Sequence, residues 1–240
     1  MIIDKGLPSR QFADVVESFR DHVDFIKFGW GTSMVTKNFQ RKLDVLREAG
    51  VDFYLGGTLF EKYIIQDRFD EFRSLCQSFG CRYVEVSNGT IDLENDDKAD
   101  YVKRLSDDFW VISEVGFKDA TRSDVMAPRQ WISNIRADLD AGAVLVTLET
   151  REAGRGGICR SNGELRYGLI EEILASDIPH ELLLFEAPSV DLQSYFIQRV
   201  GTDVNLGNIA VSDIIPLETI RLGLRSETLL YFERRPSLVD

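Results

Sequence analysis

Histidine and cysteine are scarce in this chain of 240 residues, which has two of the first and three of the second. His22 and His180 both come just before β-rich segments, at the end of a barrel away from its catalytic residues. With no other histidine, a His-based catalytic triad and a histidine-rich metal site are excluded. Cys76, Cys81 and Cys159 are odd in number and form no CxxC pair, so we expect neither a disulfide framework nor a zinc site. A metal, if bound, is expected to be a hard, oxygen-liganded ion such as Mg²⁺.

Long apolar runs and a basic charge balance are also missing. No apolar run approaches the roughly 20 residues of a membrane span. The chain starts with charged residues almost at once and has no signal-peptide pattern, so we expect no membrane partner and a cytoplasmic location. The net charge is −12 and the sequence pI is near 4.7, which argues against a nucleic-acid partner. A small anionic substrate would need a local cluster of Lys and Arg.

What the sequence does contain is one recurring pattern. An amphipathic stretch ends at a glycine, as at Gly50 and Gly80, and a short β-rich run follows. Glycine tolerates the left-handed conformation that ends a helix. The predicted strands are 2–4, 23–28, 51–55, 82–87, 109–114, 143–149, 181–186 and 203–206. The predicted helices are 8–20, 39–49, 69–79, 94–107, 131–139, 168–175, 195–200 and 212–222.

Eight strand–helix units in strict alternation predict a parallel sheet of the α/β class. Eight units in a chain of this length favour a single-domain (β/α)8 TIM barrel over residues 1–240. The alternative is an open, flavodoxin-like sheet. Residues 226–240 are expected to form a C-terminal extension. Its apolar residues Leu229, Leu230, Tyr231 and Phe232 predict packing on the barrel or on a neighbouring subunit, which would make the chain a homo-oligomer.

Charged residues at strand ends mark the candidate site, because catalytic residues of a barrel lie at the carboxyl ends of its strands. Charges inside apolar strands are costly to bury unless they are paired or bound to an ion. Each one alone is consistent with a structural ion pair. Their recurrence at the same end of successive strands favours a functional site. The residues concerned are Lys27, Glu85, Glu114, Glu149 and Glu186.

Strand alternation extends this set, because side chains two residues apart share a face. If Glu114 points into the barrel mouth, Lys118 does too, and Phe117 points away. By the same rule Arg151 accompanies Glu149.

A glycine-rich segment, Gly154-Arg155-Gly156-Gly157, follows the sixth predicted strand. Its free backbone N–H groups and its arginine are typical of a loop that wraps a phosphate. A loop with ordinary turn glycines is the alternative. The loop is long for a connection between a strand and a helix, which favours a lid or a ligand-binding loop.

Several of these segments resemble the phosphosulfolactate synthase family. They are Asp4-Lys5-Gly6-Leu7-Pro8, Lys27-Phe28-Gly29-Trp30-Gly31-Thr32-Ser33, Gly56-Gly57-Thr58-Leu59-Phe60-Glu61, Glu114-Val115-Gly116, Phe185-Glu186-Ala187-Pro188, Val204-Asn205-Leu206 and Gly223-Leu224-Arg225. The resemblance covers nearly the whole chain and implies the barrel independently of the strand count. It also implies a carbon–sulfur lyase that adds sulfite to phosphoenolpyruvate with Mg²⁺, giving (2R)-phospho-3-sulfolactate. In methanogens this reaction starts one route to coenzyme M, and some bacteria make sulfolactate instead.

The resemblance gives each candidate an expected role. Lys118 is the expected general acid, with Lys27 and Glu85 as the other catalytic residues. Mg²⁺ is expected on Glu114, Glu149 or Glu186. The residues expected to bind substrate or its phosphate are Lys5, Arg151, Arg155, Gly156, Gly157, Asn205 and Arg225.

The chain also departs from the family pattern. Asn88 stands where the family has Asp, and Phe117-Lys118 stands where it has two lysines. The segment from Glu149 to Gly156 replaces Gly-Arg-Glu-Ser-Gly-Lys-Gly. If the general acid is the first of the two lysines, Phe117 has replaced it. The alternative functions are therefore a barrel homologue acting on another phosphorylated three-carbon acid and a non-catalytic, stress-related member of the family.

Overall fold

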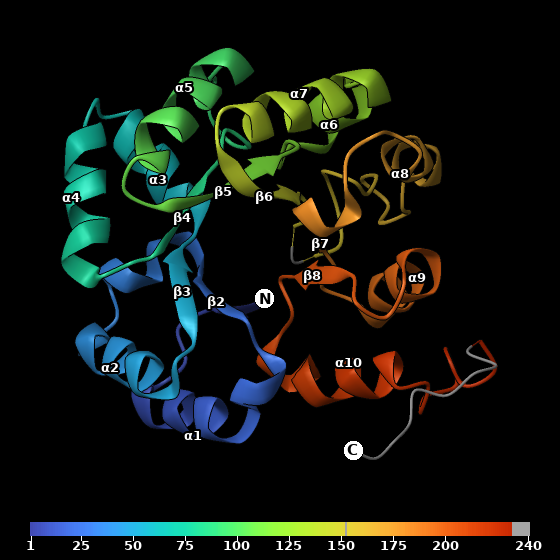
Figure 1. Ribbon diagram of the computed structural model, residues 1–240, viewed down its shortest axis with the longest axis horizontal. Coiled ribbons are helices and arrows are strands. Elements are labelled where there is room, and N and C mark those ends of the chain that lie inside the picture. The colour runs from blue at the N-terminus through green and yellow to red at the C-terminus, as the bar shows by residue number, and fades with distance from the viewer. Residues whose placement is uncertain (152, 232–240) are drawn as a thin grey trace.

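The computed structural model describes residues 1–151 and 153–231. Eight parallel strands follow one another around a central axis (Figure 1). Their bounds are β1 Ile2–Asp4, β2 Phe25–Phe28, β3 Asp52–Leu55, β4 Tyr83–Val86, β5 Trp110–Val115, β6 Ala143–Leu148, β7 Leu183–Glu186 and β8 Asn205–Gly207. Hydrogen-bonded ladders join neighbouring strands in chain order, in one sheet from β1 through β2 to β3 and in a second sheet from β4 through β7 to β8. All eight predicted strands are therefore confirmed, with ends shifted by one or two residues.

The two ladders curve into a barrel. A parallel bridge between Ile2 and Ile209 joins the end of β8 to β1, and the Ile3 N–H donates to the Ile209 carbonyl at 3.1 Å. Strands β3 and β4 lie next to each other without a ladder in the described chain. A flavodoxin-like sheet would reverse its strand order at a switch point. Because the order here is unbroken, the predicted TIM barrel is confirmed.

The helices form an outer ring around the strands (Figure 1). Those that were expected are α1 Ser9–Phe19, α2 Phe39–Ala49, α4 Phe69–Phe79, α5 Asn95–Ser106, α7 Pro128–Asp140, α8 Tyr167–Leu174, α9 Val190–Val200 and α10 Ile214–Arg221. Two short helices, α3 Gly57–Ile64 and α6 Ala120–Val125, were not expected. Both follow directly on a strand end, so they bring extra residues to the rim where the site lies.

The barrel interior changes from apolar to charged along the strands. Tyr83, Ile112 and Leu184 are buried there, in one cluster. Two residues further along β4, β5 and β7, on the same face, come Glu85, Glu114 and Glu186. The apolar layer closes the barrel beneath the carboxylates, so the charged groups form a floor at its carboxyl end.

The described part of the C-terminal tail contacts α9. Gln198 donates to the Glu227 carbonyl, and the Tyr231 hydroxyl donates to the Gln198 carbonyl. Leu230 is 90% exposed. Residues 232–240, with Phe232, lie outside the described residues, and packing of the tail on a neighbouring subunit stays a prediction.

Two expectations from composition can be compared with the fold. All three cysteines are free and buried, as expected from their number and spacing. Within residues 1–151 and 153–231, no helix has the length and apolar character needed to cross a bilayer.

Candidate active site

Lys27 lies among three carboxylates at the floor of the barrel mouth. Its Nζ is 3.0 Å from Glu85 Oε1, 3.2 Å from Glu186 Oε1 and 3.4 Å from Glu114 Oε2. All four residues are buried. The strand-end charges predicted from the sequence are thus brought together, each from a different strand.

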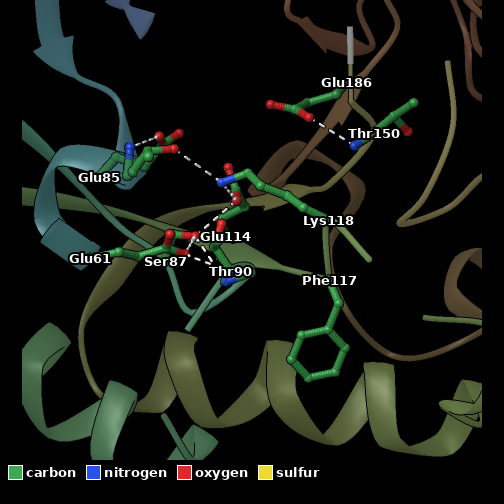
Figure 2. Close-up of polar contacts among 12 residues, drawn as sticks. Glu61, Glu85, Ser87, Thr90, Glu114, Phe117, Lys118, Thr150 and Glu186 are labelled. Atoms are coloured by element: carbon green, nitrogen blue, oxygen red, sulfur yellow. Dashed lines mark hydrogen bonds and ion pairs between the residues drawn. The ribbon is translucent and has the colours of Figure 1, made fainter. Parts of the chain in front are cut away.

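A second lysine reaches the cluster from the loop after β5. Lys118 Nζ is 3.5 Å from Glu114 Oε1 and donates to Thr58 Oγ1 at 3.3 Å. Phe117 points away from the carboxylates, as strand alternation predicted (Figure 2). The replaced lysine position of the family therefore does not face the cluster in this chain, and Lys118 does.

Glu61 is a member of the cluster that was not assigned to the site from the sequence. Its Oε1 lies 2.8 Å from Ser87 Oγ and accepts from the Thr90 N–H at 3.0 Å (Figure 2). Ser87 Oγ also lies 2.9 Å from Glu114 Oε1. Glu61 comes from the unexpected helix α3. The sequence feature that could have identified Glu61 is an acidic residue inside the apolar run that follows Gly57.

Main-chain groups orient two of the carboxylates. The Gly57 N–H donates to Glu85 Oε2 at 2.5 Å, and the Thr150 N–H donates to Glu186 Oε2 at 2.7 Å. Any side chain at Gly57 would place its Cβ 2.5 Å from the Ser87 Cβ, which is closer than atoms can approach. This glycine therefore permits the close contact between α3 and β4 that fixes Glu85.

The cluster carries more negative than positive charge. Among the described residues it contains two ammonium groups, of Lys27 and Lys118, and five carboxylates, so the formal charge is about −3 when all are ionised. The carboxylates are those of Glu61, Glu85, Glu114, Glu149 and Glu186. Charge of one sign is costly to bury. The group must therefore hold protons, or a cation.

The lysines and carboxylates shift one another's pKa values. Burial alone would lower the pKa of Lys27, but the charges of Glu85, Glu186 and Glu114 outweigh it and raise that pKa well above its ordinary value. Burial, with the negative charges of Glu114 and Glu186, raises the pKa of Glu149 well above its usual range. Lys27 is therefore held as an ammonium ion, and Glu149 retains its proton more readily than an exposed glutamate.

Glu186 and Glu114 are shifted in opposite directions. Burial raises the pKa of Glu186 to about 7, although the charge of Lys27 acts against the shift. Burial also acts to raise the pKa of Glu114, but Lys118 and Lys27 outweigh it and hold this pKa below its usual range. Carboxyl groups with separated pKa values, lying next to one another, are typical of sites that bind metals or transfer protons.

Glu114, Glu149 and Glu186 fit a hard divalent cation. Each offers a carboxylate oxygen, and these oxygens lie within 4.8 Å of one another. Oxygen donors of this kind are the ligands that Mg²⁺ prefers. These three residues would hold the ion, which would also offset the excess negative charge.

A cavity of about 580 Å³ opens above this floor. That volume suits a small molecule. Lys27, Lys118 and Glu186 line its base, and Trp30 also borders it. Further lining residues that were not assigned from the sequence are Thr58, Thr90, Asp119, Arg122 and Asn208.

The residues expected to bind phosphate are only partly at this cavity. Arg151 lines it, and Lys5 lies beside it with its Nζ 5.8 Å from the Trp30 ring. Arg155 is exposed and is not among the lining residues.

The glycine loop packs against the chain instead of facing the cavity. The Gly157 N–H donates to the Phe117 carbonyl at 3.1 Å, and a Cβ at Gly157 would lie 1.8 Å from the Glu149 carbonyl oxygen. A Cβ at Gly156 would lie 2.9 Å from the Lys118 carbonyl oxygen. Gly156 and Gly157 therefore serve close backbone packing, and their binding of a phosphate stays a prediction that this packing does not favour.

Asn205 and Arg225, which were also expected to bind substrate, lie away from this cavity. Asn205 begins β8, so it lies at the opposite end of the barrel, where its amide donates to the Glu181 and Leu183 carbonyls. Arg225 follows α10, which leads away from the rim, and pairs with Glu227 at 3.0 Å. It is not among the cavity-lining residues.

Asn88, the other departure from the family pattern, does not point at the carboxylates. Its amide donates to the Leu93 carbonyl at 2.8 Å, and it lines a small neighbouring cavity with Phe117. This side chain therefore makes its hydrogen bond away from Glu114, Glu149 and Glu186.

A buried group of carboxylates and lysines at the carboxyl rim of a (β/α)8 barrel lies where TIM-barrel enzymes have their active sites. The barrel is also similar to that in a crystal structure of 3-hexulose-6-phosphate synthase, with a TM-score of 0.58, 10% identity, and coverage of 91% of this chain and 96% of that one.

Sequence comparison is more specific. The model of the (2R)-phospho-3-sulfolactate synthase (ComA) family matches residues 1–227. Phosphosulfolactate synthase of Bacillus subtilis (strain 168) is 47% identical over 228 residues, covering 95% of this chain and 90% of the relative. That of Methanothermobacter thermautotrophicus is 40% identical over 233 residues, with the same coverage. The chain belongs to the phosphosulfolactate synthase family.

Proposed function

We propose that this chain adds sulfite to C3 of phosphoenolpyruvate, giving (2R)-phospho-3-sulfolactate, as a Mg²⁺-dependent carbon–sulfur lyase working in the synthetic direction. Family membership and the composition of the cavity floor support the proposal. We also propose that it acts in the cytoplasm, where its three free cysteines remain reduced.

The proposed reaction is a conjugate addition. The sulfur lone pair of sulfite forms the C–S bond at C3, and the C2–C3 π pair moves onto C2 and the carboxylate. A proton then adds to C2, and the phosphate ester is retained. Glu114, Glu149 and Glu186 would hold Mg²⁺, which when bound would supply positive charge next to the substrate carboxylate.

Lys118 is the proposed proton donor to C2. It lines the cavity and is held as an ammonium ion, since the negative charges of Glu114 and Glu149 outweigh the effect of burial and raise its pKa. After the transfer, a proton from solvent restores the ammonium. Lys27 keeps its charge in place among the carboxylates and would offer a fixed positive charge beneath the substrate carboxylate.

The observation that carries the proposal is the presence of two ammonium groups within one carboxylate cluster on the floor of a cavity. A site that binds anions needs cations that stay charged when they are buried. The carboxylates of the cluster favour the charged form of both lysines, because they raise the pKa of each. Three carboxylates of the same cluster would be available to hold the metal.

The direct test is an assay of the purified chain with phosphoenolpyruvate and sulfite, with and without Mg²⁺, in which phosphosulfolactate is detected by ³¹P NMR. Mg²⁺-dependent product supports the proposal. Turnover of a different phosphorylated three-carbon acid, with none of phosphoenolpyruvate, would identify another enzyme of this family. A folded protein that binds no phosphoenolpyruvate would identify a non-catalytic member.

A further inference from the structure

Arg122 lies on α6 between two cavities, and it lines both that of the candidate site and the small neighbouring one that Phe117 lines. Its guanidinium carbon is 4.0 Å from the centre of the Phe117 ring, which is within cation–π range. Its ion pair with Asp92 is long, at 3.9 Å, and the Asp92 side chain is 99% exposed. Such a pair is weak, so the charge of Arg122 remains available to an anion in the cavity.

The short helix that carries Arg122 is braced from two sides. Ser123 Oγ donates to the Phe117 carbonyl at 2.8 Å and accepts from the Phe117 N–H at 3.1 Å. The buried Arg166 donates to the Ser123 carbonyl at 2.7 Å and to the Met126 carbonyl at 3.1 Å. The backbone beneath Arg122 and the ring beside its guanidinium are therefore fixed relative to each other before any ligand arrives.

The other lining cations differ from Arg122 in this respect. Within the described chain, Lys27 and Lys118 line the cavity but are paired with carboxylates. Arg151 lines it and is exposed. Arg122 alone among these four has its charged group placed by an aromatic ring. A pre-placed guanidinium loses less side-chain freedom when it binds an oxyanion.

We propose that Arg122, supported by the ring of Phe117, binds a tetrahedral oxyanion at the wall of the cavity. This inference rests on the proposed function, whose substrates carry such groups as a phosphate ester and as sulfite. A guanidinium presents two parallel N–H groups to two oxygens of such an anion. Phe117 is thus a positioning residue for Arg122, although it points away from the carboxylate cluster.

Calorimetric titration with inorganic phosphate, and separately with sulfite, tests this without using catalysis. Arg122→Met is expected to weaken binding of at least one of these anions by about tenfold. Arg122→Lys should recover only part of the affinity, because an ammonium lacks the planar pair of donors. Arg129→Met, at an exposed arginine of α7, is the matched control and should bind as the wild type does.

The two titrations distinguish the source of the anion. Weaker phosphate binding assigns Arg122 to the phosphate ester, and weaker sulfite binding assigns it to the nucleophile. If Arg122→Met binds both anions as tightly as the wild type does, the proposal is overturned. Thermal unfolding followed by circular dichroism shows whether each variant is folded. If Arg122→Met is unfolded, the anion affinity of Arg122→Lys is compared with that of the wild type instead, and equal affinities overturn the proposal.

A double-mutant cycle tests the role of Phe117. Phe117→Leu should weaken anion binding by about threefold when Arg122 is present and should have no further effect in the Arg122→Met background. An equal effect in both backgrounds would overturn the positioning role. Anion binding through Arg122 without any phosphosulfolactate formation would refute the proposed function and leave this inference intact.

Discussion

Lys98 donates a hydrogen bond to the main-chain carbonyl of Glu114 at 2.9 Å, from the helix side of β5, while the carboxylate of Glu114 lines the cavity. The same Nζ is 2.7 Å from Asp138 Oδ2, and Ser113 Oγ donates to that oxygen at 2.6 Å. Lys98 and Asp138 are fully buried. An ion pair between α5 and α7 therefore fixes the backbone of a proposed metal ligand.

Lys98→Met should destabilise the fold by about 3 kcal/mol, because it leaves the Asp138 carboxylate buried without its partner. The double variant Lys98→Met/Asp138→Asn should regain part of that loss, since no charge remains buried. Urea unfolding measures both. Arg136→Met breaks an exposed pair with Asp177 and should cost much less, because water screens it. Equal losses in the two single variants would contradict the structural role of Lys98.

Glu149→Gln should stabilise the metal-free protein and remove its response to Mg²⁺. Burial and the charges of Glu114 and Glu186 raise the pKa of Glu149, so folding at pH 8 either buries its charge or takes up a proton. The neutral amide avoids both, and a gain in the free energy of unfolding is expected. Thermal unfolding in EDTA and in Mg²⁺ measures both effects. Glu172→Gln, at an exposed glutamate of α8, is the control. If Mg²⁺ raises the Tm of Glu149→Gln as much as that of the wild type, Glu149 is not a ligand.

The stability of the metal-free protein should fall as pH rises from about 4.5 to 7. Burial raises the pKa of Glu186 to about 7, so in this window the folded chain holds a proton that the unfolded chain has released. The effect is on the order of 3 kcal/mol, because one pKa unit corresponds to about 1.4 kcal/mol. Urea unfolding in EDTA at several pH values should show a smaller slope for Glu186→Gln. An identical slope in both proteins would show that Glu186 does not titrate in this range.

Gly57→Ala should disrupt the site, whereas Gly168→Ala should stabilise the protein. A Cβ at Gly57 would meet the Ser87 Cβ at 2.5 Å, and the Gly57 N–H orients Glu85. Forcing a methyl group into this contact is expected to cost about 1–3 kcal/mol. A Cβ at Gly168, in α8, meets nothing within 4 Å, and alanine should gain roughly 0.5–1 kcal/mol there. Chemical denaturation of both variants checks the opposite signs.

The sequence predicted the barrel and its charged floor because both depend on local patterns. Apolar runs that end in a charge, as at Glu85 and Glu114, mark strand ends, and parallel strands bring those ends to one rim. Alternation along β5 placed Lys118 and Phe117 on opposite sides, which the structure confirms (Figure 2). These predictions need only the two-residue repeat of side-chain direction along a strand.

The remaining parts of the site depend on contacts distant in sequence. Glu61 and Arg122 lie on helices that follow the strand ends, and neither helix has an amphipathic pattern long enough to be recognised. A glycine in the sequence indicates that another group packs closely on the backbone or that φ is positive. It does not indicate which group packs there. At Gly157 the neighbour is the Glu149 backbone, which the sequence pattern did not indicate.

Lys118→Ala should lower kcat by about 10²–10⁴-fold with little change in the KM for sulfite, because proton delivery to C2 is its proposed task. Metal-dependent thermal stabilisation should persist, since Lys118 is not a ligand. Lys118→Arg should not restore kcat, because a guanidinium does not release its proton readily. Lys103→Ala, at an exposed lysine of α5, is the matched control in a steady-state assay of phosphosulfolactate formation. Undiminished kcat in Lys118→Ala would show that another group is the proton donor. Lys27 would then be the next candidate, because its ammonium also pairs with Glu114.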